Sequence, residues 1–383
     1  MESNHMPDVG ENIPIRIYDT TKQWVLATES YLGKVKDRYQ EIYPASIVTR
    51  SGPRTIGHEY HWKFRQQLYV KLAPAFVALI PNGRIWGPEG TVITNDRSLL
   101  ADVAPAFCRS SKEHPIFSEQ NLPSPVEFDC TAVVLTAPGG QRNFFHWLFD
   151  VLPRIHLLHS SRFALEQIDR HIVNNIHLAY QHETLQKLGI VLDDVIESDY
   201  FPHIRCRRLI VPSITRLDIN MPAWIPQYIR SIFMHDILRV NHQQRKFIYI
   251  SRQGAERRRV VNEFEVRSFL ENHGFTTILP ETLSVAQQAS IFASARCVIG
   301  PHGAGLSDIV FCPPHTKIVE FFSPSCVRPH YWGLSNLLEL DYYYLLGEGK
   351  RPPEYIDPDK ENEDITVDIS ALKDLLKLAS IIY

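Results

Sequence analysis

The sequence predicts an α/β protein with two doubly wound lobes. Short apolar runs typical of buried strands alternate with amphipathic segments of about a dozen residues, the pattern of parallel sheets with helical crossovers. This pattern occurs twice, from Cys130 to Val240 and from Lys246 to Leu346, with a polar connector between the two series. In such sheets ligands bind at the carboxyl ends of the strands. We therefore expect two lobes with a cleft between them.

The boundaries follow from the same pattern. We expect an N-terminal lobe, a C-terminal lobe and a terminal extension: residues 1–240 (with a loose tail at 1–14 and a β-hairpin region at 68–95), residues 241–350, and residues 351–383 (an acidic connector and a last helix). Asn82-Gly83 separates two apolar runs and is the strongest local signal for a hairpin. Residues 22–43, which precede Pro44, are expected to form one helix.

Composition narrows the function classes. The chain has 383 residues, a formal net charge of −3 and 44% apolar residues, so it carries no electrostatic footprint for nucleic acid or an anionic membrane. No run reaches the ~18 apolar residues of a membrane span, and residues 1–30 do not read as a signal peptide. The six cysteines are scattered without a CxxC pair, which indicates reduced, buried thiols rather than disulfides or a zinc site. We expect a soluble, cytoplasmic protein.

The most informative stretch is Cys297–Phe322, which predicts a strand, a glycine loop, a short helix and a second strand. Gly303, Ala304 and Gly305 open the helix, and small residues at a helix start let an anion approach free backbone N–H groups. The loop therefore predicts a phosphate site. Plain strand-to-helix packing, with glycine merely allowing a tight turn, is the alternative.

A polar stripe follows the glycine loop at residues 138–140. Asn143, His146, Asp150 and Arg154 are spaced i, i+3, i+7 and i+11, so they share one helix face. Facing a cleft, Asp150 or His146 can take a proton from a hydroxyl. In the structural alternative Asn143 caps the helix, Asp150 pairs with Arg154, and His146 is a core histidine. Pro153 is expected to kink or end this helix.

A third feature is the basic segment Tyr249–Val266. Arg252 ends a predicted strand, a run of three arginines from Arg257 to Arg259 follows, and Asn262 starts a helix. Arginine suits a diphosphate because its planar fork donates two parallel hydrogen bonds. We expect one of the three consecutive arginines to point inward and the others to be solvated. The alternative is a fully solvated charged loop.

Together these segments resemble glycosyltransferase family 61. The matching residues are NFFHWLFDVLPR, YISR with ERRRVVNEFEV, and the run from Gly274 to Phe322 that contains GPHGAGL. The resemblance implies a GT-B fold, with two Rossmann-like lobes facing each other across a cleft. It also implies an inverting, metal-independent transfer from a nucleotide diphosphate sugar, by default a uridine diphosphate sugar, with no cofactor.

The resemblance also implies roles for individual residues. Asp150 and His146 are the catalytic candidates, supported by Asn143 as the helix cap and by Arg154. The donor-binding candidates come from the second half of the chain: Arg252, Arg258, Asn262, His302, Gly303, Ala304, Gly305, Leu306 and Glu320. We favour Asp150 as the base with His146 orienting it, and Glu320 as acceptor for the ribose hydroxyls.

The hairpin region and the lack of a signal anchor resemble the bacterial branch of the family. This resemblance implies a role in capsular or exopolysaccharide assembly, a glycan or glycolipid acceptor, and peripheral association with the assembly machinery. A non-catalytic nucleotide- or glycan-binding module on the same scaffold is the alternative. A dinucleotide-binding oxidoreductase is disfavoured because HGAGLSD lacks the third glycine. A metal-dependent GT-A transferase is disfavoured because neither Asp193-Asp194 nor Asp357-x-Asp359 is placed on a strand end.

Overall fold

The computed structural model describes residues 12–57, 59–104, 110–165, 167–216, 219–238 and 246–383. These residues form two compact units. The first is built from the chain up to Ala45 and from Ala73–Thr215, and the second from Ser46–Leu72 and Arg216–Tyr383. The sequence placed the boundary at residue 240, whereas the structure places it after Thr215 and adds Ser46–Leu72 to the second unit.

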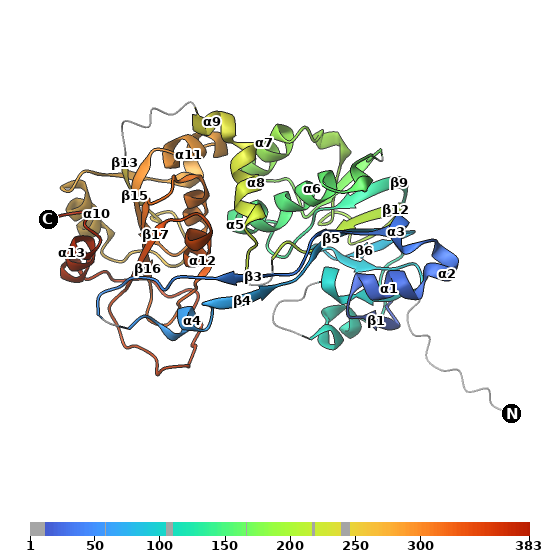
Figure 1. Cartoon of the computed structure of the whole chain (residues 1–383), viewed down its shortest axis with the longest axis horizontal. Coiled ribbons are helices and arrows are strands. Elements are labelled where there is room, and N and C mark those ends of the chain that lie inside the picture. Colours follow the sequence, from blue (N-terminus) through green and yellow to red (C-terminus); the bar gives the residue numbers. More distant parts are fainter. Residues whose placement is uncertain (1–11, 58, 105–109, 166, 217–218, 239–245) are drawn as a thin grey trace. The chain divides into compact units, whose positions relative to one another are not determined.

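The first unit contains a large mixed sheet (Figure 1). Its strands are β1 (Arg16–Tyr18), β2 (Tyr39–Tyr43), β5 (Ala75–Pro81), β6 (Arg84–Trp86), β7 (Thr91–Ile93), β8 (Ser98–Leu100), β9 (Val126–Val134), β10 (Arg170–Val173), β11 (Val195–Glu197) and β12 (His203–Pro212). Strands β12, β9, β10 and β11 run parallel, while β5 and β6 pair antiparallel with β12. The predicted α/β pattern is therefore present, but parallel strands make up only one part of this sheet.

The hairpin predicted at Asn82-Gly83 is wrong. Strands β5 and β6 lie in line along β12, because Pro81 is opposite Arg208 and Arg84 is opposite Arg205. Asn82 adopts a left-handed conformation with φ of 49°. The register along β12 nevertheless continues unbroken across these two residues, so the chain does not reverse there. The hairpin of this region joins β6 to β7 instead.

The helix predicted at residues 22–43 is also wrong. The chain forms α1 (Thr21–Ala27), α2 (Glu29–Leu32) and α3 (Val35–Arg38) and then enters β2, which pairs with β5. Gly33, with φ of 99°, separates α2 from α3, and glycine takes this conformation without strain. Of the predicted tail, residues 1–11 lie outside the described residues, and Ile13 is buried against Ile93 and Ile116.

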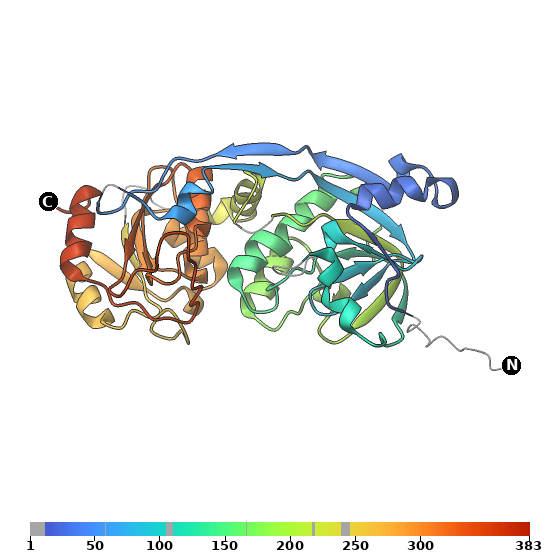
Figure 2. The ribbon, with the colours of Figure 1, turned by 90° about the horizontal axis from the view of Figure 1, so that it is seen from below.

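The second unit contains a parallel sheet in the order β14-β13-β15-β16-β17. Its strands are β13 (Lys246–Ile250), β14 (Phe275–Ile278), β15 (Ala295–Pro301), β16 (Lys317–Phe322) and β17 (Asp341–Leu346). This order is the doubly wound order 2-1-3-4-5, in which ligands bind at the carboxyl ends of the first and third strands. A separate antiparallel pair consists of β3 (Ser46–Thr49) and β4 (Tyr69–Leu72), drawn in blue in Figure 2.

Helices pack on both sheets. In the first unit they are η1 (Ala101–Val103), η2 (Ser111–Glu113), η3 (Pro115–Ser118), α5 (Phe144–His146), the π-helix η4 (Trp147–Val151), α6 (Leu152–His159), η5 (Arg162–Leu165), α7 (Ala179–Lys187) and η6 (Leu192–Asp194). In the second they are α4 (Trp62–Arg65), α8 (Trp224–Ile232), α9 (Met234–Leu238), α10 (Glu263–Glu271), η7 (Pro280–Thr282), α11 (Val285–Phe292), η8 (Ala304–Phe311), α12 (His330–Leu337) and α13 (Ile369–Leu378). The predicted start of α11 at Ser284 is confirmed by a capping box with Gln287.

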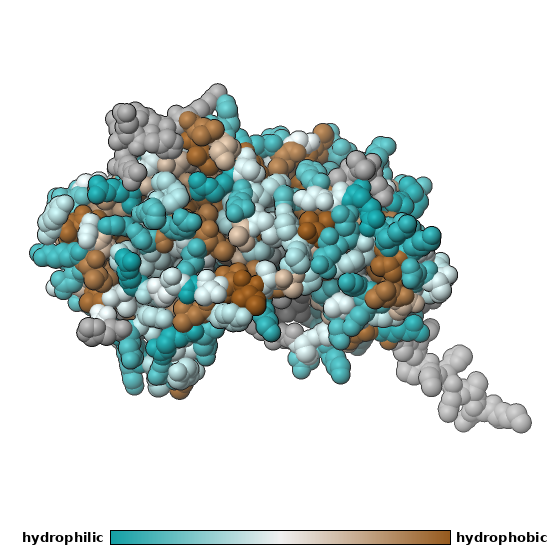
Figure 3. Space-filling model, in the orientation of Figure 1, coloured by the Kyte–Doolittle hydropathy of each residue, from teal (hydrophilic) through white to brown (hydrophobic). Residues whose placement is uncertain are grey.

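The surface of the protein carries both polar and apolar residues. The face in Figure 3 is largely hydrophilic with small apolar patches. Within the described residues, every helix is too short or too polar to cross a bilayer.

The cysteines that the structure describes are buried free thiols, as the sequence predicts: Cys130, Cys206, Cys297, Cys312 and Cys326. Cys108 lies outside the described residues.

Candidate active site

One group of predicted site residues lies where β13 and β15 end. Arg252 follows β13 and Gly303 follows β15, at the point where the sheet's winding reverses. A Cβ built on Gly303 would lie 1.9 Å from Nη1 of Arg252, so the guanidinium rests directly on this backbone. The φ of Gly303 is 168°, an extended value open to any residue. The close approach of Arg252, rather than the backbone conformation, therefore requires glycine.

Arg258 brings a second positive charge to this place. It has a left-handed φ of 55° and is half-buried, whereas Arg257 and Arg259 on either side are exposed. The expectation that one of the three arginines points inward is thus confirmed. Burial lowers the pKa of Arg252, and the positive charge of Arg258 lowers it further.

The neighbouring arginines form ion pairs, whereas Arg252 and Arg258 form none with the described residues. Asp364 pairs with Arg259, at 2.8 Å, and Asp359 and Glu361 pair with Arg328. In the part of the chain that the structure describes, no carboxylate forms an ion pair with Arg252 or Arg258. Two half-buried guanidiniums that form no ion pair within the described residues, beside a bare glycine backbone, favour an anion such as a diphosphate.

His302, next to Gly303, is held by a buried chain of hydrogen bonds. Its Nδ1 lies 2.5 Å from Oε1 of Glu320, and Oε2 of Glu320 accepts a hydrogen bond of 2.5 Å from Tyr342. Burial and then the positive charge of Arg258 lower the pKa of His302 well below its usual value, so its ring stays neutral. Burial likewise raises the pKa of Glu320 well above its usual value.

Glu320 and Asn262 sit differently from the roles assigned to them. Glu320 has no exposed surface and both its oxygens are engaged, which argues against direct contact with ribose. Asn262 donates to the carbonyl of Val367 and accepts from its N–H, at 2.8 and 3.0 Å. Its side chain thus fastens the start of α10 to the segment before α13.

The remaining loop residues open η8, a 3₁₀ helix. The N–H of Leu306 donates to the carbonyl of Gly303 at 3.0 Å, and Leu306 itself is buried, while Ala304 and Gly305 are partly exposed. Tyr331 also donates to the Gly303 carbonyl, at 2.7 Å. The sequence carried no signal for Tyr331 or Tyr342, because their partners lie tens of residues away.

The second group of predicted residues lies in the first unit, after β9. Asn143 caps α5 by accepting from the N–H of Phe145 at 3.0 Å, as its position predicts. Nδ1 of His146 lies 2.7 Å from Oδ2 of Asp150. The chain forms a π-turn over η4 before α6 continues through Pro153, so the proline does not end the helix. Such turns are frequent at functional sites.

Arg154 supports this helix from the buried side. It donates to the carbonyl of Pro212 at 2.7 Å and also to the carbonyl of Thr136. Burial lowers its pKa to about 10, against the opposing influence of Asp150. Arg154 therefore fastens the end of β12 and the end of β9 to the helix that carries His146 and Asp150.

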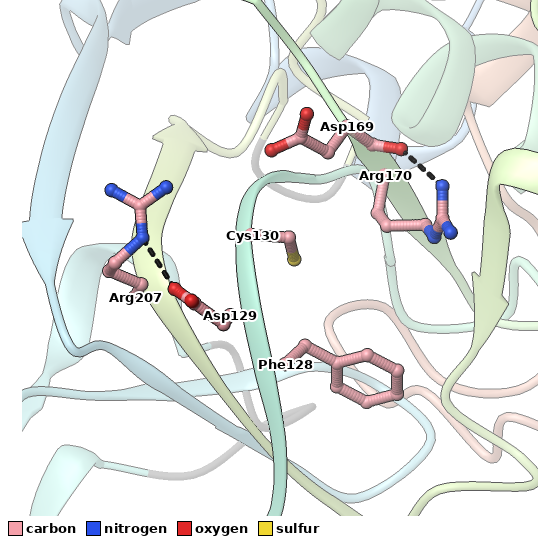
Figure 4. Close-up of a pocket in the computed structure, with 6 residues that line it drawn as sticks. All are labelled: Phe128, Asp129, Cys130, Asp169, Arg170 and Arg207. Atoms are coloured by element: carbon pink, nitrogen blue, oxygen red, sulfur yellow. Dashed lines mark hydrogen bonds and ion pairs between the residues drawn. The ribbon is translucent and has the colours of Figure 1, made fainter.

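A cavity of about 570 Å³ lies elsewhere in the first unit, near the amino end of β10 (Figure 4). It is lined by Phe128, Asp129, Cys130, Asp169, Arg170 and Arg207. Its arginines are already neutralised, since Arg207 pairs with Asp129 at 2.6 Å and Arg170 with Asp194 at 2.7 Å. None of the predicted site residues lines it. Among the described residues, no cluster of three histidine, cysteine or acidic side chains is placed to hold a metal ion.

Gly303→Ala tests the contact with Arg252. The new methyl group displaces the guanidinium, which is the far end of a flexible side chain, so we expect stability to change by less than ~1 kcal/mol. Affinity for uridine diphosphate should fall by about tenfold, as for one lost charged hydrogen bond. Gly254→Ala is the matched control, because its Cβ would lie 3.7 Å from Glu281. Thermal unfolding measures the stability of each variant, and calorimetric titration measures its affinity for uridine diphosphate. Equal affinities for Gly303→Ala and Gly254→Ala would contradict the role of the contact.

A comparison with known protein families covers the residues of this site. Residues 144–319 match the sequence profile of the family described as Glycosyltransferase 61. This segment is similar to glycosyltransferase family 61. It contains His146, Asp150, Arg252 and the loop at Gly303. The resemblance to this family that the sequence predicts is confirmed over this segment.

Two curated relatives agree with this assignment over a short stretch. The chain is 38% identical over 63 residues to beta-1,2-xylosyltransferase RCN11 of Oryza sativa subsp. japonica, and 35% identical over 63 residues to a beta-1,2-xylosyltransferase of Arabidopsis thaliana. The match covers 16% of this chain and 12% of each relative. Both are plant enzymes, so they lend no support to the bacterial capsular branch, which stays a prediction.

Proposed function

We propose that this protein transfers a sugar, with inversion and without a metal ion, from a nucleotide diphosphate sugar to a hydroxyl of a glycan. The observation that carries the proposal is the pair Arg252 and Arg258 at the switch point of a parallel sheet, where neither forms an ion pair with a described carboxylate. A departing diphosphate gains negative charge as the glycosidic bond breaks, and fixed cations stabilise that charge. In a metal-independent transfer these two guanidiniums meet it.

The first unit supplies the base. Asp150 accepts from Nδ1 of His146, which leaves Nε2 to take the proton of the acceptor hydroxyl. The side chain of His146 is 21% exposed and that of Asp150 is 11% exposed, so the imidazole is the more accessible group. We therefore propose His146 as the base and Asp150 as its orienting partner, the reverse of the order favoured from sequence.

The proposal extends to the identity of the nucleotide, the sugar and the acceptor. Uridine diphosphate is the nucleotide that the family resemblance favours, and the relatives' names make UDP-xylose the first donor to test. The acceptor is a glycan or glycolipid, and a place in capsular or exopolysaccharide assembly stays a prediction. So do the GT-B fold and the cytoplasmic location.

A donor screen tests the proposal. The full chain is incubated with a panel of nucleotide sugars in the presence of EDTA, and mass spectrometry follows slow release of the nucleoside diphosphate. We expect release from one donor, faster when a hydroxylated glycan is added. Binding of uridine diphosphate without release from any donor would favour a non-catalytic binding module. Neither binding nor release would overturn the proposal.

A further inference from the structure

The loop that follows β14 reaches the same edge of the second sheet as Arg252 and Gly303. Strand β14 lies next to β13 and β13 lies next to β15, all three parallel, so their carboxyl ends are neighbours. The N–H of Ser251, which precedes Arg252, donates to the carbonyl of Ile278 at 3.0 Å. The end of β14 is thus joined directly to the segment that carries Arg252.

Pro280 packs this loop against the glycine loop. A Cβ built on Gly305 would lie 3.4 Å from Cγ of Pro280. In addition, the buried side chain of Gln288 on α11 donates to the carbonyls of Pro280, at 2.8 Å, and Leu283, at 3.0 Å. The loop after β14 is therefore held by contacts with both the glycine loop and α11.

Glu281 is the acidic residue that this loop presents to solvent. Its side chain is exposed, whereas the preceding Pro280 is buried. Within the described residues its carboxylate takes part in no hydrogen bond or ion pair. A Cβ built on Gly254, two residues after Arg252, would lie 3.7 Å from Oε1 of Glu281, an ordinary van der Waals contact that leaves the carboxylate in place. Burial and then Arg258 lower the pKa of Arg252, while the negative charge of Glu281 raises it.

A nucleoside joined to a diphosphate at Arg252 and Gly303 can extend along this edge in two directions. Toward β16 the carboxylate is that of Glu320, which is fully buried and has both oxygens engaged. Toward β14 it is that of Glu281, which is exposed and has both oxygens available. Neighbouring strands are only about 4.8 Å apart, so a group attached to the diphosphate reaches the end of β14.

We propose that Glu281 binds the ribose of the donor by accepting hydrogen bonds from its 2′- and 3′-hydroxyls, and so selects ribonucleoside over deoxyribonucleoside diphosphate sugars. The inference rests on the proposed function, because it takes the diphosphate to lie at Arg252 and Arg258. A carboxylate suits two neighbouring hydroxyls, since each of its oxygens can accept one hydrogen bond. An acidic residue binds ribose in this way in sheets that hold dinucleotides. The role expected of Glu320 thus passes to Glu281.

Calorimetric titration of the full chain tests this assignment without requiring turnover. The ligands are inorganic pyrophosphate and the diphosphates of uridine, cytidine, adenosine and guanosine, each in its ribo and 2′-deoxyribo form. We expect the parent to bind the ribo form of its preferred nucleotide about tenfold more tightly than the deoxy form, as for one charged hydrogen bond. In Glu281→Ala the two forms should bind within about twofold of each other.

Pyrophosphate and a second variant provide the controls. The affinity of Glu281→Ala for pyrophosphate should equal or exceed that of the parent, because the variant removes a negative charge that acts on Arg252. Asp374→Ala removes the same formal charge from an exposed position on α13, a helix that carries none of the proposed site residues, and should keep the tenfold preference. Glu281→Gln retains the size of the side chain and serves if Glu281→Ala does not fold.

The outcomes separate this inference from the proposed function. A parent that binds both forms equally, or a preference that persists in folded Glu281→Ala, overturns the role of Glu281. An equal gain in affinity for pyrophosphate and both nucleotide forms does so too, since Glu281 then only balances the charge of Arg252. A parent that binds neither pyrophosphate nor any nucleotide overturns the diphosphate site and the proposed function together. A preference that depends on Glu281, in a protein that releases no nucleotide in the donor screen, supports the ribose site and overturns the transfer.

Discussion

His146→Ala is expected to lower kcat for sugar transfer by about 10²–10⁴, the range that a positioned general base contributes. The pairing of His146 with Asp150 explains the size of this effect. The 2.7 Å contact between them fixes the imidazole ring and leaves Nε2 for the acceptor hydroxyl. Affinity for uridine diphosphate should stay within threefold of the parent, since the cationic residues lie on other elements. Steady-state kinetics with the donor found by the screen, and calorimetric titration with uridine diphosphate, measure both quantities.

Asp150→Asn is the partner variant. An amide can donate to Nδ1 and so favours the tautomer whose Nε2 carries a proton and cannot accept one. We expect a loss of kcat of similar order, with nucleotide affinity kept. Added imidazole should restore part of the activity of His146→Ala but none of that of Asp150→Asn. If His146→Ala kept a tenth of the parent rate while Asp150→Asn was inactive, the base would be Asp150, as first favoured from sequence.

Arg258→Ala is expected to lower turnover by about two to three orders of magnitude, the cost of one lost electrostatic donor at a developing charge. Arg258 reaches the site because its left-handed backbone, with φ of 55°, turns it inward from an exposed loop. Affinity for uridine diphosphate should fall as well, and should depend less on salt than in the parent.

Arg259→Ala is the matched control for this variant. Arg259 is the next residue in the same loop, it is exposed, and it pairs with Asp364, so its loss removes the same formal charge without touching the site. Kinetics and calorimetric titration should show parent-like values for Arg259→Ala. If Arg258→Ala also remained within threefold of the parent in rate and affinity, about 0.7 kcal/mol, the diphosphate site would be misassigned.

Some features of this protein were readable from the chain because their causes are local. The cap at Asn143 and the capping box at Ser284 depend on neighbours two or three residues away. Short runs of apolar residues mark the strands of the second sheet. The motifs that resemble family 61 are likewise contiguous segments. They lie within or at the edge of residues 144–319, which match the family profile.

Local signals failed where long-range pairing decided the outcome. Asn82-Gly83 carries the strongest hairpin signal in the sequence, yet β12 pairs with the strands on both sides of it and keeps them in line. Residues 39–43 continue a helical pattern, yet they pair with β5 as a strand. In both places backbone hydrogen bonds to a distant strand outweigh a preference of the neighbouring residues.

The sequence by itself determined which residue types are available for chemistry: the stripe at His146 and Asp150, the arginines, and the glycine loop. Only the tertiary structure decided what each one touches. The contact of Arg252 with Gly303 and the chain from His302 through Glu320 to Tyr342 join residues 18 to 51 positions apart. Such contacts depend on strand order and on turns packed against one another, which no short stretch of sequence encodes.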